Sequence, residues 1–150
     1  AGTVLDVQVV RRCLDALVMR HASLRTHIVD DAETKQAMQR VCPACDFDVS
    51  LDVMDDSDND NDANGVAAFV SRVSEAVFDL YAGPWVRFGL AHDTARDCST
   101  LVIAMHHIAG DGWSLGSLPS ELWHGSKNTE SDYTINIYTP VLRNFLSIFC

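Results

Sequence analysis

The sequence lacks an apolar run long enough to cross a lipid bilayer, which would take about 20 consecutive residues. It has no signal peptide and no internal repeats, and it does not begin with methionine. These absences lead us to expect a cytoplasmic protein without a membrane partner, cut out of a longer chain.

Positive charge is scarce, because 11 Lys and Arg residues stand against 21 Asp and Glu residues and give a formal net charge of −10. A nucleic-acid partner is therefore disfavoured, since phosphate binding needs a basic surface. Five of the acidic residues lie within 55–62, which we interpret as a solvated loop. Residues 60–65 match the first half of an EF-hand, but Ser71 stands where the bidentate glutamate should be, so no calcium site is predicted.

The five cysteines lack the even number and regular spacing of a disulfide framework. Cys42 and Cys45 form a single C-x-x-C pair, and no second pair of ligands follows at a spacing that suits zinc. A redox pair should open a helix after a strand, whereas the residues after Cys45 alternate as in a strand. We interpret 42–45 as a plain loop and predict no metal and no cofactor bound by this chain.

Apolar patterning is well developed: 47% of the residues are hydrophobic, which suits one globular domain or one lobe of a larger domain. Helical spacing predicts helices over 5–19, with Asp6 as the N-cap, and over 66–77. The β-rich or alternating segments predict strands over 24–29, 35–41, 47–53, 85–91 and 100–105.

The strand predicted over 100–105 is almost entirely apolar, so we expect it at the centre of a sheet with both faces covered. A short helix through Leu115, Leu118 and Leu122 should follow, and 141–149 could form a terminal helix. The mixed order of elements predicts an α+β fold, a mixed β-sheet covered by helices.

Two adjacent histidines, His106 and His107, follow this central strand directly. Neighbouring side chains on a strand point to opposite faces, so we expect one histidine to face a cleft and the other to pack behind the sheet. Asp111 lies four residues beyond His107 in a glycine-rich turn. By residue type alone, a satisfied core histidine or a metal ligand stays possible, although adjacent strand histidines point apart and are poor joint zinc ligands.

The segment 106–114, HHIAGDGWS, resembles the signature of condensation domains from nonribosomal peptide synthetases, which belong to the chloramphenicol-acetyltransferase-like superfamily. Two further family motifs occur in the same order. Residues 20–26, RHASLRT, are similar to RHExLRT, with Ala22 at the glutamate position. Residues 78–87, FDLYAGPWVR, are similar to FDLxxGPLxR, with Trp85 at the leucine position.

The resemblance implies a chloramphenicol-acetyltransferase-like lobe. It identifies residues 1–124 as a partial condensation domain, the N-terminal lobe, and leaves residues 125–150 as an unassigned tail without a family pattern. The C-terminal lobe is missing. Pro119 departs from the family, because it falls inside the helix that usually follows the histidine motif and would kink it.

The resemblance further implies that the intact domain forms amide bonds in nonribosomal peptide synthesis. The amine of an aminoacyl acceptor would attack an acyl or peptidyl donor thioester, both held on the phosphopantetheine of carrier proteins. The implied partners are these carrier proteins, the adjacent synthetase modules and the missing lobe.

Two residues are implied in the chemistry and four in the structure of the motifs. His107 would face the cleft and either accept the proton of the amine or hold the amine, and the backbone N–H of Gly112 would donate to the oxyanion. His106, Asp111, Arg25 and Arg20 would be structural: Asp111 is expected to pair with Arg25, with Arg20 as the reserve cation. Phe78, Leu80, Pro84 and Trp85 are expected in the core.

Other functions compete with condensation. One is another acyltransferase of the superfamily that forms esters, and another is an epimerisation domain; Trp113, Ser114 and the motif at 20–26 favour condensation over both. A third is a catalytically inactive fragment that only docks other modules. Because only part of one lobe is here, the chain by itself is expected to be inactive.

Overall fold

The computed structural model describes residues 5–43, 47–54, 63–94, 96–110, 117–118, 121–122 and the backbone of 134–138. Its elements are, in order, α1 (Val7–Arg20), the 3-10 helix η1 (Ala22–Arg25), β1 (Thr26–Asp30), β2 (Ala37–Val41), β3 (Leu51–Val53), α2 (Ala63–Glu75), β4 (Val86–Asp93), β5 (Cys98–Met105) and β6 (Thr134–Tyr138). Within these ranges, neither helix has the length and apolar character that a bilayer span requires.

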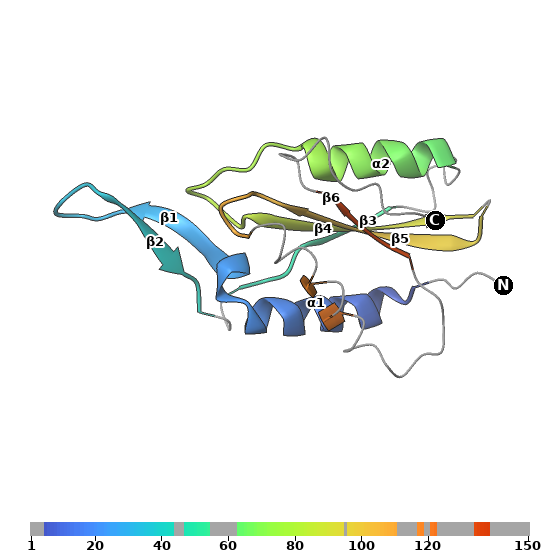
Figure 1. Ribbon diagram of the computed structural model, residues 1–150, viewed down its shortest axis with the longest axis horizontal. Coiled ribbons are helices and arrows are strands. Elements are labelled where there is room, and N and C mark those ends of the chain that lie inside the picture. The colour runs from blue at the N-terminus through green and yellow to red at the C-terminus, as the bar shows by residue number, and fades with distance from the viewer. Residues whose placement is uncertain are drawn as a thin grey trace.

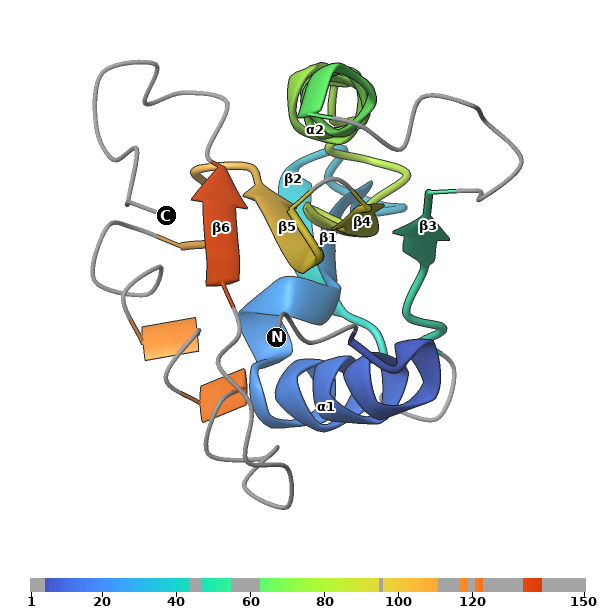
Figure 2. The ribbon, with the colours of Figure 1, turned by 90° about the vertical axis from the view of Figure 1, so that its right-hand side faces the viewer.

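A four-stranded mixed sheet forms the middle layer, in the order β3-β4-β5-β6. The strands β4 and β5 form an antiparallel hairpin, while β3 runs parallel to β4 and β6 runs parallel to β5. Helix α1 covers one face of the sheet and α2 covers the other (Figures 1 and 2). The antiparallel β1–β2 hairpin projects away from this body (Figure 1). The predicted α+β architecture is confirmed.

The N-terminal helix is confirmed together with its cap. The side chain of Asp6 accepts hydrogen bonds from the backbone N–H groups of Gln8 and Val9, at 2.7 and 3.2 Å, which satisfies two donors that a helix start leaves without partners. The buried face of α1 consists of the predicted apolar stripe, Val10, Leu14, Leu17 and Val18. Apolar periodicity therefore predicted both the helix and its inner face.

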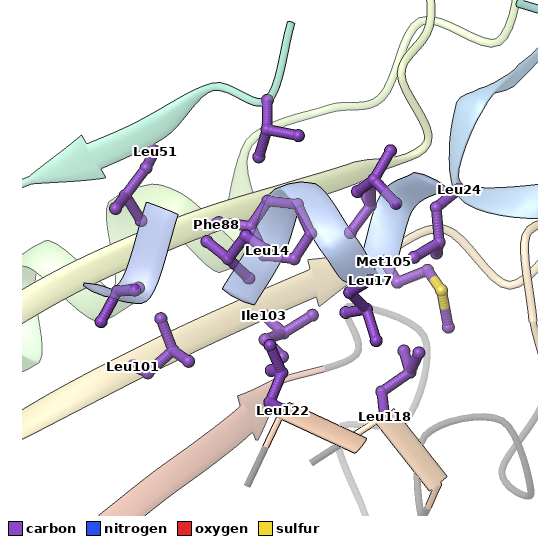
Figure 3. Packing of buried hydrophobic residues seen from close by; sticks show 14 of the residues in the cluster. Leu14, Leu17, Leu24, Leu51, Phe88, Leu101, Ile103, Met105, Leu118 and Leu122 are labelled. Carbon is purple, nitrogen blue, oxygen red and sulfur yellow. The ribbon is translucent and has the colours of Figure 1, made fainter. Parts of the chain in front are cut away.

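Strand β5 is central, as predicted, because it lies between β4 and β6 and its residues are buried from Ser99 to Met105. Its alternate side chains enter two different clusters. Leu101, Ile103 and Met105 pack with α1, whereas Val102 and Ala104 pack with α2. Figure 3 shows the first cluster, in which Ile103 lies between the leucines of α1 and Leu122. The strand β6 was not predicted, since its residues fell within the unassigned tail.

Several predicted boundaries were wrong for local reasons. The strand expected over 24–29 begins only at Thr26, because the preceding residues wind into η1. The strand expected over 47–53 shortens to β3, although Val49 outside it is buried. Helix α2 ends before Val77, whose 89% exposure contradicts its expected place on the apolar stripe. The acidic segment 55–62 and the helix expected over 141–149 lie outside the described residues.

An ion-pair cluster holds the segment around Leu122 against the end of α1. The Oε2 atom of Glu121 lies 3.2 Å from Nη1 of Arg20 and 2.8 Å from Nε2 of His21, the C-cap of α1. The hydrogen bond from His21, and then the charges of His21 and Arg20, lower the pKa of Glu121. Next to this cluster, Leu118 and Leu122 are buried in the α1-side core. The ionised form of Glu121 therefore stabilises this docking.

We predict that Glu121→Gln lowers the melting temperature at neutral pH and has no effect in strong acid. The pKa of Glu121 is lower in the folded chain than in the unfolded chain. Its carboxylate therefore contributes fully to folding stability at a pH above the unfolded pKa of about 4.3, and this contribution disappears as the pH falls through the folded pKa. Melting temperatures of both proteins, measured from neutral to acid pH, test this. Glu75→Gln, at the exposed end of α2, is the control. A difference between wild type and Glu121→Gln that stays constant with pH would refute the assignment.

Candidate functional site

The two histidines lie just beyond the carboxyl end of β5, and their surroundings differ. The backbone N–H of His106 donates to the carbonyl of Trp85 at 2.8 Å, which extends the β4–β5 ladder by one residue. The His106 side chain is half-buried, whereas His107 is exposed in the turn that follows. The central strand therefore ends in one histidine held against the protein and one presented to solvent.

Bonds to His106 hold the turn that carries His107. The Nδ1 atom of His106 accepts a hydrogen bond from the backbone N–H of Ile108 at 3.2 Å. The carbonyl of His106 accepts another from the N–H of Ala109 at 2.9 Å, and Ala109 itself is buried. With its neighbours fixed on both sides, the backbone of His107 has a defined position while its imidazole stays accessible.

The expected partners of this motif are only partly described. Asp111 and Gly112 lie outside the described residues. Arg25 ends η1, and its guanidinium donates to the carbonyl of Cys42. Its Nε atom is buried and, within the described parts of the chain, has no hydrogen-bond partner. Arg20, the reserve cation, is 71% exposed at its side chain and contacts Glu121.

The motif at 78–87 builds a turn next to His106. The side chain of Asp79 accepts hydrogen bonds from the N–H groups of Tyr81 and Ala82, at 2.9 and 3.1 Å, and these bonds lower the pKa of its carboxyl. The indole N–H of Trp85 donates to the carbonyl of Leu80 at 3.0 Å, and the indole is almost completely buried. Trp85 is buried in the core as predicted, and Phe78 and Leu80 are partly buried and pack against it; Pro84 is exposed, so that expectation was wrong.

A glycine is required in this turn. Gly83 has φ +57°, a left-handed conformation that L side chains rarely adopt, and a Cβ atom there would lie 3.0 Å from Cβ of His27. The turn therefore packs closely on β1, and a backbone bond from Ile28 N–H to the Leu80 carbonyl, at 2.9 Å, joins the two segments. The motif thus connects β1 to β4.

Of the two cysteines in the C-x-x-C pair, which we interpret as part of a loop, the structure describes Cys42. Cys42 directly follows β2, and its Sγ atom lies 3.3 Å from Nδ1 of His27. Cys45 lies outside the described residues. Where the chain is described, no three His, Cys, Asp or Glu side chains group closely enough to hold a metal ion.

Sequence reasoning missed two features of this region. Glu121 carries no motif, and no local pattern links it to Arg20 and His21, which lie 101 and 100 residues earlier in the chain. Phe78 was assigned to the core alone, yet its ring also meets that of His106 with 6.0 Å between centroids and 72° between planes. No local pattern predicts that contact, because 28 residues separate the two rings.

Comparison with known proteins gives consistent matches over most of the chain. The family model for the condensation domain matches residues 2–137. Phosphinothricin tripeptide synthetase PhsB of Streptomyces viridochromogenes is 36% identical over 125 residues, 80% of this chain and 10% of that protein. Chondramide synthase cmdD of Chondromyces crocatus is 31% identical over 112 residues, 75% of this chain and 3% of that protein. The chain thus spans a small part of these relatives.

Solved structures show the same fold. The starter condensation domain of rhizomide synthetase RzmA superposes with a TM-score of 0.64 at 17% identity, over 88% of this chain and 33% of that one. The structure of holo T3CT superposes with a TM-score of 0.59 at 19% identity, over 91% of this chain and 30% of that one. With the order of the three motifs and the match over 2–137, these findings show that the chain belongs to the condensation-domain family of nonribosomal peptide synthetases.

Proposed function

We propose that the domain containing this chain joins a carrier-bound acyl or peptidyl donor to a carrier-bound aminoacyl acceptor by an amide bond. The observation that carries the proposal is the exposed His107 on a fixed turn at the end of the central strand. This arrangement suits a side chain that must meet a substrate at a defined place. Membership in the family supplies the class of reaction.

In the proposed reaction, the acceptor amine attacks the carbonyl carbon of the donor thioester. A C–N bond forms, the C–S bond then breaks, and the donor's pantetheine thiol leaves. A free α-amine has a pKa of about 8, so a neutral fraction exists at cellular pH without an enzymatic base. The harder step is the tetrahedral intermediate, in which the nitrogen becomes cationic and the oxygen anionic. His107 accepts the proton from that nitrogen or holds the amine by a hydrogen bond.

Two further parts complete the proposed site. The backbone N–H of Gly112 donates to the oxyanion, since a glycine allows the substrate to approach the backbone closely. The second part is the C-terminal lobe, because the chain covers only about a third of the solved condensation domain that it resembles. The tunnel between lobes excludes water and admits the phosphopantetheine arms of two carrier proteins. Alone, the chain presents half of this site and is inactive.

We also propose that Asp111 pairs with Arg25 and stabilises the turn after His107. The buried Nε of Arg25, which has no partner in the described parts of the chain, supports this pair. A buried guanidinium nitrogen without an acceptor is costly, and a carboxylate is its best partner. Arg20 is disfavoured as the partner, because its side chain is 71% exposed and bonded to Glu121.

We predict that His107→Ala in the complete domain lowers amide formation at least about 100-fold, the usual range for losing a positioned acid–base group. The exposed side chain makes few packing contacts, so the fold should survive. The test is the rate of amide formation between loaded carrier proteins, measured by mass spectrometry. His92→Ala is the control, because His92 lies at the opposite end of the β4–β5 hairpin. If a folded His107→Ala protein forms product at the wild-type rate, His107 has no part in the mechanism. If the unmutated domain binds carrier proteins but forms no product, a docking function is favoured instead.

We predict that Asp111→Asn acts through stability. Removing the carboxylate strands the Arg25 charge, which for a buried pair costs about 3–5 kcal/mol. Urea denaturation of the complete domain measures the change in the free energy of unfolding. Arg20→Gln should change it by less than about 1 kcal/mol, because the Arg20 pair is at the surface. An unchanged unfolding midpoint in Asp111→Asn, combined with lost turnover, would instead point to a direct chemical role.

A further inference from the structure

Arg87, on strand β4, shares the α2-side face of the sheet with His106. In the β4–β5 register Arg87 lies opposite Ala104, which packs in the α2-side cluster. His106 follows two residues after Ala104, so the alternation of the strand directs it to the same face. No function for Arg87 was predicted from its motif.

The guanidinium of Arg87 fixes the chain that leaves α2. Its two terminal nitrogens donate to the backbone carbonyls of Ala76 and Val77. Its central carbon lies 4.1 Å from the centroid of the Phe78 ring, in a cation–π contact. Phe78 is thereby held both through the backbone just before it and through its ring.

The Phe78 ring carries this constraint to His106. The two rings meet edge to face, with 6.0 Å between centroids and 72° between planes, an arrangement that aromatic pairs favour. The His106 imidazole also accepts a hydrogen bond from the N–H of Ile108 at Nδ1. In a neutral imidazole that accepts at Nδ1, the proton resides on Nε2. A rotation of the ring would break the bond to Ile108 and leave the turn held by the backbone bond from Ala109 to the His106 carbonyl.

We propose that Arg87 and Phe78 are positioning residues that hold His106 in one rotamer and one tautomer, so that its Nδ1 fixes the turn presenting His107. The functional part of this inference rests on the proposed reaction. Neither residue touches the reacting atoms: the constraint runs from Arg87 to Phe78, to His106 and then to the backbone beside His107.

The chain contains a matched control for this contact. Phe69 is buried in the same cluster and lies under the guanidinium of Arg72, at 5.0 Å from centroid to Cζ. Its replacement by leucine removes the same ring and the same kind of cation–π contact, on helix α2. The aromatic contact of His106 is with Phe78. A general loss of packing therefore affects both Phe69→Leu and Phe78→Leu, whereas the contact with His106 is lost only in Phe78→Leu.

The experiment compares Phe78→Leu, Phe78→Tyr, Arg87→Gln and Phe69→Leu in the complete domain. Long-range ¹H–¹⁵N spectra of labelled histidines, recorded at alkaline pH, report the tautomer of His106. We expect the Nε2–H form in the wild type, Phe78→Tyr and Phe69→Leu. We expect a mixture of tautomers in Phe78→Leu and Arg87→Gln. Turnover is measured on the same samples, with kcat corrected for the folded fraction.

We expect kcat to fall about 10- to 100-fold in Phe78→Leu while KM for the acceptor carrier stays unchanged, because a small misplacement of a reacting group costs this much. Phe78→Tyr should restore kcat. An unchanged His106 tautomer in Phe78→Leu would overturn the inference, as would an equal loss of kcat in Phe69→Leu. If His107→Ala turned over normally, the proposed function would fail, while the tautomer spectra would still decide whether Phe78 and Arg87 hold His106.

Discussion

Burial of β5 on both of its faces is the constraint on which the other parts of the structure depend. Val102 and Ile103 have no exposed surface, one facing α2 and the other facing α1. Burying an aliphatic side chain of this size contributes roughly 1.5–3 kcal/mol, so the strand can only be stable with a layer on each side. Helix α1 provides one of those layers and α2 the other, while β4 and β6 pair with the two edges of the strand. The end of β5 is consequently a rigid place for the histidine motif.

The polar contacts around this strand divide into two groups with different tasks. One group attaches peripheral segments to the core: Asp6 starts α1, and Glu121 joins the residues around Leu122 to the end of that helix. The other group, centred on His106, does not attach a helix or strand; it fixes the turn that carries His107. We infer that the first group affects mainly stability and the second mainly the position of His107.

The sequence predicted those features that depend on local periodicity. Both helices, the central position of β5 and the inner face of α1 follow from the spacing of apolar residues, and the α+β class follows from the order of the elements. The features that it did not predict depend on contacts between distant residues. Strand β6 pairs with the edge of β5. Its segment 134–138 does show the alternation of a strand, TINIY, but that alternation does not indicate which strand it joins. Likewise, the histidine motif was recognised from its spacing, but the Phe78 ring beside His106 belongs to a different motif.

The two histidines of the motif are proposed to have different tasks, His107 meeting the acceptor amine and His106 holding the turn. A crystal structure of the complete domain, with a non-hydrolysable analogue of an aminoacyl-pantetheine in the tunnel, tests this division most directly. We predict that the amine nitrogen lies within about 3.2 Å of a ring nitrogen of His107, while His106 keeps its bond to the N–H of Ile108. An amine bonded to His106, or one outside hydrogen-bond reach of His107, would contradict it.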